Sequence, residues 1–159
     1  MKHSKYTQNY LNLNKDDVDR LTKDVLENRY EMIRHFSDLK LIKKYIKPGS
    51  LLDFPIGTGR IYPHFIETHK VYGAEISIAY IENAKSKYPH IKDNFFIDDL
   101  MNISTKLKFD NIICYRAIGG ISDSLIGLTN LKNSIVEQII YYIQNFEINN
   151  DNMLHTTIE

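Results

Sequence analysis

The chain has 159 residues, of which 43% are hydrophobic and 25% charged, and this is the size of a single domain with one core. Twenty basic and twenty acidic side chains cancel, so the sequence lacks the strong positive field typical of nucleic-acid-binding proteins, and we expect no nucleic-acid partner. The single cysteine, Cys114, excludes an intrachain disulfide, no Cys/His cluster has zinc spacing, and no apolar run reaches the ~18 residues of a membrane span. These features predict a cytoplasmic protein with no membrane association and no metal.

The first third of the chain, residues 1–47, is predicted to be an arm followed by helices. Residues 1–14 are polar and are expected to be loosely ordered, with a few large apolar side chains for docking. Asn14 is placed to cap a helix from Lys15, because its side chain can accept a hydrogen bond from the first turn. A second helical pattern runs from Asn28 to Lys47 and ends at the Pro-Gly pair that follows. Its predicted apolar face holds Met32, Ile33, Phe36, Leu39, Ile42, Tyr45 and Ile46.

The stretch Ser50–Arg60 begins the second part of the chain, residues 48–159. A short apolar run ends in Asp53 and passes into a loop with Gly57 and Gly59, and a helical pattern starts at about Ile61. This order of strand, tight loop and helix points backbone N–H groups at a ligand above the strand end. Glycines can adopt positive φ and carry no Cβ that would hold a ligand away. A lone Gly-x-Gly is as often structural as functional, so the loop alone only suggests a small polar ligand.

Further strands and helices alternate after this loop. Short β-rich runs at 70–76, 95–97 and 109–115 predict three more strands, and Ser77 is placed to cap the helix between the first two. Residues 125–146 have a helical pattern, although 139–142 also suit a strand, and 153–158 are a candidate fifth strand. Strands separated by helices predict an α/β protein with a mostly parallel sheet of about five strands and right-handed crossovers.

Acidic residues follow three consecutive predicted strands. Asp53 ends the first, Glu75 the second, and Asp98 and Asp99 the third. Because ligands bind at the carboxyl edge of an open parallel sheet, these acids are expected to surround one crevice. Glu75 lies 22 residues after Asp53, close to the spacing at which an acid accepts hydrogen bonds from both ribose hydroxyls. Single acids at strand ends are common solvated caps, but their combination with the glycine loop predicts an adenosine ligand.

These segments, in this order, resemble the motifs of the class I S-adenosylmethionine-dependent methyltransferases. The resemblance covers about residues 40–120. It implies a Rossmann-like three-layer α/β/α sandwich with N-terminal helices, and S-adenosylmethionine as the cofactor with S-adenosylhomocysteine as its product. The segments that carry the resemblance to the first four motifs of the family are 51–60, 71–84, 96–100 and 109–114.

The resemblance also implies a role for individual residues. Glu75 would bind the ribose and Ile76 would pack on the adenine. Asp99 would bond the adenine amino group beside Leu100, with Asp98 as the alternative if the register differs by one. The pocket around the methionine part would be lined by Asp53, Pro55, Gly57 and Gly59, where Pro55 replaces the first glycine of the family motif.

At the end of the fourth strand, Tyr115 and Arg116 would face the sulfonium and the methyl acceptor, and Tyr115 would also contact the cofactor. They are the candidates for a catalytic role, since Cys114 is expected to be a small core residue. A general base would help with a hydroxyl or amine acceptor. The imidazoles available for this are His64, His69, His90 and His155, each expected to be an ordinary surface or helix histidine.

The predicted function is transfer of a methyl group from S-adenosylmethionine to a small molecule. A nicotinamide site is disfavoured because Tyr62 stands where the dinucleotide fingerprint needs a small residue. The family sheet has seven strands and this chain has room for about five. Two alternatives therefore stay open: a non-catalytic cofactor-binding protein or subunit of a larger assembly, and an enzyme that cleaves the cofactor. A sheet that ends early leaves an edge to cover, for which a homodimer is one arrangement.

Overall fold

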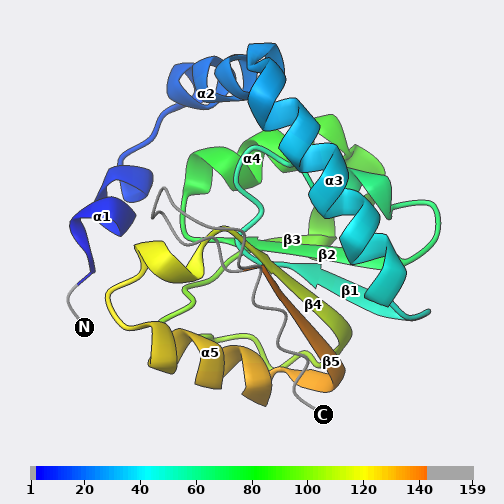
Figure 1. The fold of residues 1–159 in the computed structure, drawn as a ribbon. Helices are drawn as coiled ribbons and strands as arrows, with labels where there is room; N and C mark the ends of the chain where they lie inside the picture. The colour runs from blue at the N-terminus through cyan, green and yellow to red at the C-terminus, as the bar shows by residue number, and fades with distance from the viewer. Residues whose placement is uncertain (1–2, 143–159) are drawn as a thin grey trace, which may run out of the picture.

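The computed structural model describes residues 3–142 of the chain, and Figure 1 shows its helices and strands in order. Three helices precede the first strand, and strands then alternate with helices and short 3-10 turns. The elements are α1 (Lys5–Leu11), α2 (Lys15–Glu27), α3 (Arg29–Tyr45), β1 (Ser50–Asp53), η1 (Tyr62–His64), β2 (Lys70–Glu75), α4 (Ile78–Lys87), η2 (Pro89–Asn94), β3 (Phe95–Ile97), β4 (Phe109–Tyr115), η3 (Ile118–Gly120), α5 (Ser124–Asn133) and β5 (Ile135–Tyr142).

The five strands form one sheet in the order β3-β2-β1-β4-β5, and every pair is parallel. The chain adds β2 and β3 on one side of β1, then crosses back to add β4 and β5 on the other. The predicted parallel sheet of about five strands is therefore confirmed. The strand order reverses between β1 and β4, and the carboxyl ends beside such a reversal are where open α/β sheets bind ligands.

Helices cover both faces of the sheet, which confirms the three-layer sandwich. In Figure 1, α3 and α4 lie on one face and α5 lies on the other. Adjacent strand residues point to opposite layers: Leu51 packs in the cluster that includes Leu39 of α3 and Ile81 of α4, whereas Leu52 packs in the cluster that includes Leu131 of α5. Because both faces of β1 and β4 are buried, these strands read as continuous apolar runs in the sequence.

The N-terminal arm differs from its prediction. Residues 5–11 form the helix α1 instead of a loosely ordered segment. The Ser4 side chain caps this helix by accepting a hydrogen bond from the Thr7 N–H at 3.0 Å, and its hydroxyl donates to the Gly120 carbonyl at 2.6 Å. The Tyr10 ring lies 6.1 Å from the ring of Tyr80 on α4, centroid to centroid. These contacts place α1 against the end of η3 and beside the carboxyl edge of the sheet.

The helix α2 begins at its predicted cap, and α3 begins at a cap that was not predicted. Asn14 forms a capping box with Asp17, and Asn28 accepts a hydrogen bond from the Glu31 N–H at the start of α3. The predicted apolar face of α3 is wrong in its first half. Ile33 and Phe36 are each 57% exposed, and the buried positions there are polar, since this part of α3 lies over a cluster of charged groups described below.

Two later predictions also need correction. The segment after the glycine loop forms only η1, a 3-10 turn around Pro63, and not the longer helix expected from Ile61. The pattern at 125–146 divides into α5 and β5, which meet at Ser134, so the fifth strand is Ile135–Tyr142. The strand expected at 153–158 lies outside the described residues.

Asn111 joins β4 to the connection before β1, and its replacement by alanine is expected to lower the free energy of unfolding by about 1–3 kcal/mol. Its side chain is fully buried, accepts from the Lys47 N–H at 2.9 Å, and donates to the carbonyls of Lys47 and Ser50. Urea unfolding measures the change, with the exposed Asn9→Ala as the matched control. Equal stability of the two variants would contradict this role.

Candidate functional site

A cavity of about 260 Å³ opens at the carboxyl ends of β1, β2 and β4. It lies at the reversal of strand order, and α1 and α2 supply part of its wall through Thr7, Tyr10, Leu21 and Val25. Nine of the residues singled out in the sequence line it together: Asp53, Pro55, Gly57, Glu75, Ile76, Asp99, Leu100, Tyr115 and Arg116. Asp53, Glu75 and Asp99 thus share one crevice, as their positions in the sequence predict.

The two glycines of the loop differ in what they do. Both have positive φ, +49° for Gly57 and +80° for Gly59. Gly57 lines the cavity, and a Cβ there would meet no atom within 4 Å, so its backbone is open to a ligand. Gly59 is not part of the lining, and a Cβ there would lie 3.0 Å from the Tyr62 hydroxyl. Gly59 therefore serves the turn and its packing on Tyr62, which corrects its predicted place in the pocket wall.

Asp53 is a buried carboxyl group at the end of β1, only 1% exposed. Its Oδ2 accepts a hydrogen bond from the Tyr62 N–H at 3.1 Å, and its Oδ1 has no partner. Burial raises the pKa of Asp53 to about 8, and the nearby charge of Glu75 adds to the effect. The carboxyl group is thus mostly protonated at neutral pH, and a cation entering the cavity would favour its charged form.

Glu75 ends β2 and connects that strand to the glycine loop. Its Oε2 accepts a hydrogen bond from the Gly57 N–H at 3.1 Å, and its Oε1 accepts from the N–H groups of Ile76 and Ser77 at 2.8 and 3.3 Å. Burial raises the pKa of Glu75, against the opposing effect of these hydrogen bonds. The predicted side-chain cap by Ser77 is not formed, since its buried Oγ has no partner and its N–H bonds Glu75 instead.

The two acids after β3 have separate roles. Asp98 is 5% exposed and accepts hydrogen bonds from the N–H groups of Asp99, Ser104 and Thr105 at 2.8–3.0 Å. It holds the loop after β3 and does not line the cavity, so the geometry favours Asp99 over Asp98 as the ligand-binding acid. Asp99 lines the cavity. Its Oδ1 accepts from the Met101 N–H at 2.9 Å, and the group is the one placed to meet a ligand.

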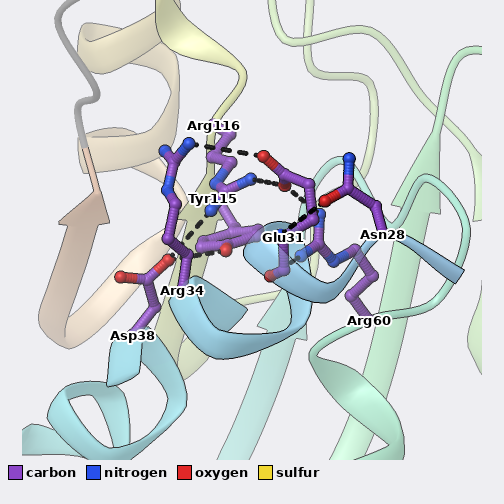
Figure 2. A network of polar contacts seen from close by, with 7 residues as sticks. All are labelled: Asn28, Glu31, Arg34, Asp38, Arg60, Tyr115 and Arg116. Atoms are coloured by element: carbon purple, nitrogen blue, oxygen red, sulfur yellow. Dashed lines mark hydrogen bonds and ion pairs between the residues drawn. The ribbon is translucent and has the colours of Figure 1, made fainter. Parts of the chain in front are cut away.

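Figure 2 shows a group of charged side chains, here called the Glu31 cluster, which connects α3 to the loops beside the cavity. Glu31 accepts hydrogen bonds from Arg116 at 2.5 Å and from Arg34 and Arg60 at 3.3 Å. Asp38 accepts from the Tyr115 hydroxyl at 2.7 Å and from Arg116 at 3.2 Å. The members of the cluster are Asn28, Glu31, Arg34, Asp38, Arg60, Tyr115 and Arg116.

The cluster shifts the titration of its members. Burial opposes the charged form of Glu31, but the hydrogen bond and charge of Arg116, helped by Arg60 and Arg34, lower the pKa of Glu31 below its usual value. Burial and the hydrogen bond to Asp38 raise the pKa of Tyr115, so its hydroxyl stays neutral. Arg60 and Arg116 flank the Tyr115 ring, with their guanidinium carbons 5.7 and 4.8 Å from its centroid. Both arginines line the cavity.

Of the described histidines, His3 lies near the cavity, with its Nδ1 3.8 Å from Oδ2 of Asp99, and the candidate general bases are placed elsewhere. The Nε2 atom of His64 lies 3.3 Å from that of His35 on α3. His69 contacts Thr68 and the Lys47 carbonyl. Neither they nor His90 belong to the cavity lining, and His155 lies outside the described residues. Cys114 is fully buried, which raises the pKa of its thiol, and it packs in the core as expected.

Two further properties concern residues 3–142 alone. In this part of the chain, no three His, Cys, Asp or Glu side chains are placed to hold a metal ion. Nor does any helix in it have the length and apolarity needed to cross a bilayer.

Neither a protein-family model nor the sequence of a curated protein matches the chain. Solved structures do match. A protein of Methanococcus maripaludis assigned to the S-adenosylmethionine-dependent methyltransferases aligns with a TM-score of 0.65 at 13% identity, over 81% of this chain and 63% of its own. The N-methyltransferase NodS of Bradyrhizobium japonicum, solved with S-adenosylhomocysteine, aligns with a TM-score of 0.62 at 14% identity, over 85% of this chain and 69% of its own.

A third match is an S-adenosylmethionine-dependent methyltransferase of Clostridium acetobutylicum, with a TM-score of 0.59 at 20% identity, over 69% of this chain and 50% of its own. The chain has the class I methyltransferase fold. It spans 63% and 50% of the lengths of the Methanococcus and Clostridium proteins. At these identities the likeness concerns the fold, and the site must be argued from the residues of this chain.

Several residues of the cavity lining carry no motif. Thr7 and Tyr10 reach the cavity because α1 docks beside it, and Leu21 and Val25 show in the sequence only as one side of a helix. Arg60 follows the last loop glycine directly, and that position is the one signal that could have found it. Glu31 and Asp38 give no local signal for the cavity, since their partners in the loops beside it lie at least 29 residues away in the chain.

Asp53→Asn is expected to make protein stability less dependent on pH between about 6 and 8. The folded protein holds a proton on Asp53 up to a pKa of about 8, whereas the unfolded chain releases it near 3.8. Stability therefore falls as pH rises through this window, by up to about 1.4 kcal/mol per pH unit for one proton. Asparagine keeps the acceptor for the Tyr62 N–H but cannot ionise.

Urea unfolding at several pH values measures this slope for the wild type and the variant. The exposed Asp93→Asn serves as the control and should follow the wild type. The contributions of the histidines are common to all three proteins and cancel in the comparison, whereas the coupling between Asp53 and Glu75 is part of the difference in slope that is measured. Parallel stability curves for Asp53→Asn and the wild type would contradict a raised pKa.

Proposed function

We propose that the protein is an S-adenosylmethionine-dependent methyltransferase that acts on a small-molecule acceptor. The observation that carries the proposal is the shared cavity wall formed by Asp53, Gly57 and Glu75, from the ends of β1 and β2 and the loop between β1 and η1. A nucleoside with a cationic tail fits this set. Glu75 would meet the sugar, Asp53 would meet the cationic tail, and the backbone of Gly57 between them is accessible.

The residues present fit the parts of the cofactor. Glu75 uses three of the roughly four lone-pair sites of a carboxylate on backbone N–H groups, so it keeps capacity to accept from a ribose hydroxyl. Asp99 would accept from the adenine amino group, with Ile76 and Leu100 as apolar walls for the ring. The unpartnered, buried Oδ1 of Asp53 is suited to the positively charged end of the ligand.

The chemistry of such a site requires little from the protein beyond alignment. When bound, S-adenosylmethionine supplies an electrophilic methyl group on a sulfonium. The residues of this chain would hold the acceptor atom in line with that methyl at about 3–3.5 Å and exclude water, and no nucleophile on the protein is needed. Tyr115 and Arg116, at the end of β4, would face the acceptor. Tyr10 and Thr7 of α1 would help to close it.

A small acceptor is supported by the cavity walls, because α1 and α2 stand over the carboxyl edge and contribute side chains to its lining. An assay with S-adenosylmethionine and a panel of small amines, alcohols and carboxylates tests transfer. Binding of S-adenosylhomocysteine without transfer to any acceptor would favour a non-catalytic cofactor-binding protein. Formation of methylthioadenosine without an acceptor would instead indicate cleavage of the cofactor.

Glu75→Ala is expected to weaken S-adenosylhomocysteine binding by about 1.5–3 kcal/mol, the scale of a hydrogen bond to a charged group. Isothermal titration calorimetry measures the affinity, and circular dichroism confirms that the variant is folded. The exposed Glu82→Ala on α4 controls for the loss of a carboxylate and should bind as the wild type does. Unchanged affinity in Glu75→Ala would remove the ribose assignment.

The neighbouring acids Asp98 and Asp99 are expected to separate stability from binding. Asp98→Asn should lower the free energy of unfolding by about 1–3 kcal/mol, because an amide N–H₂ then faces backbone N–H donors. Asp99→Asn should cost little stability but weaken S-adenosylhomocysteine binding by about 1–2 kcal/mol. Urea unfolding and calorimetry on both variants measure the two effects. The reverse pattern would show that Asp98 is the ligand-binding acid.

A further inference from the structure

Arg60 and Arg116 form a cationic wall on one side of the cavity. Both line it, both side chains are 17% exposed, and they flank the ring of Tyr115. They come from the loop after β1 and from the residue after β4, so the sheet itself brings them together. Figure 2 shows them meeting at Glu31.

The Glu31 cluster has more positive charge than its own acids neutralise. Three guanidinium groups, on Arg34, Arg60 and Arg116, face the two carboxylates of Glu31 and Asp38. Among residues 3–142, the Nε atoms of Arg60 and Arg116 and one Nη of Arg34 are buried and find no hydrogen-bond partner. Tyr115 adds no negative charge, since its hydroxyl donates to Asp38. The cluster therefore has a surplus of one positive charge and unused donors beside the cavity.

The backbone at Arg116 supports a functional reason for this arrangement. Its φ is +57°, and it is the one non-glycine residue with positive φ in the described part of the chain. An L-residue in this region is strained, and such strain persists where the surroundings hold it and is concentrated at functional sites. Here the two acids on α3 hold the Arg116 side chain from one side, with Tyr115 beneath it. The guanidinium is thus fixed in advance at the cavity wall.

We propose that Arg60 and Arg116 bind an anionic group of the methyl acceptor, a carboxylate or a phosphate. This inference rests on the proposed function and names the acceptor class for the same site. Guanidinium groups bind such anions through charge-assisted hydrogen bonds, and a monoanion would balance the surplus charge of the cluster. The apolar wall formed by Leu21 and Val25 lines the same cavity, so the acceptor combines an anionic group with an apolar body.

The position of Arg116 favours the acceptor over the cofactor. The residues assigned to the nucleoside, Glu75 and Asp99, follow β2 and β3, whereas Arg116 follows β4 on the other side of β1. A ligand whose sugar and base lie over β2 and β3 leaves the β4 side for the second substrate. The carboxylate of the methionine part has the same chemistry, so the experiment must distinguish the two sources.

The test uses probes of one shape that differ in charge, benzoate and benzyl alcohol, titrated calorimetrically into the protein saturated with S-adenosylhomocysteine. The wild type is expected to bind benzoate about tenfold or more tighter than benzyl alcohol, the scale of a charge-assisted hydrogen bond. Arg116→Gln should lose this preference and Arg116→Lys should keep part of it. The exposed Arg20→Gln on α2, which removes the same charge, should leave it unchanged.

A second variant, expected to tighten benzoate binding instead of weakening it, keeps the test decisive if Arg116→Gln fails to fold. Glu31→Gln removes an internal competitor for both arginines, so it is expected to tighten benzoate binding several-fold while benzyl alcohol binding stays the same. A folded Glu31→Gln protein with unchanged or weaker benzoate binding would overturn the proposal. So would a wild type that binds the two probes equally, or an Arg116→Gln variant that keeps the preference.

A comparison of two nucleosides shows whether Arg116 binds the anion of the acceptor or the carboxylate of the cofactor. Methylthioadenosine has the same nucleoside as S-adenosylhomocysteine but lacks the amino-acid tail. The ratio of their affinities should be the same in the wild type and Arg116→Gln, and a collapse of that ratio would assign Arg116 to the cofactor tail and overturn the acceptor assignment. If the wild type binds neither nucleoside, the proposed function fails, and benzoate preference in the free protein still decides whether the pair binds anions.

Discussion

Each carboxylate at the carboxyl edge of this sheet is held by backbone N–H groups, and the loops of the site depend on this constraint. A buried carboxylate needs donors, and the donors nearest to a strand end are the N–H groups of the chain that follows it. Asp53 accepts from Tyr62, Glu75 from Gly57, Ile76 and Ser77, and Asp98 from the loop after β3. The acids thus fix the conformation of the loops, and only the carboxylate oxygens that still have hydrogen-bonding capacity can accept from a ligand.

The parts of the fold that the sequence predicted are those set by local patterns. β1 and β4 bury both faces and so read as apolar runs, and α2 and α3 begin at Asn14 and Asn28, whose side chains cap them. The acids after β1, β2 and β3 meet because parallel strands end at one edge. That geometry follows from the order of the elements alone, so Asp53, Glu75 and Asp99 could be placed at one crevice without coordinates, whereas most of the other predicted lining residues came from the resemblance to the methyltransferase motifs.

The errors have a common physical cause, which is contact over long distances in the sequence. α1 is a helix because Ser4 reaches Gly120, and the first half of α3 buries His35 and Asp38 because arginines from two distant loops lie beneath it. Asp98 and Asp99 are adjacent in the sequence, and only the fold of residues 104–105 over one of them separates their roles. The acceptor, a homodimer and a cytoplasmic location stay predictions.

The docking of α1 couples the start of the chain to the contents of the site. A helix of seven residues has little stability of its own, and it rests on the body of the protein through Ser4 and the ring of Tyr10. A ligand that touches Thr7 and Tyr10 would stabilise the folded state of α1, and by linkage the folding of α1 would raise the affinity for that ligand. The helix α1 is therefore both a wall of the cavity and an element whose stability depends on what the cavity holds.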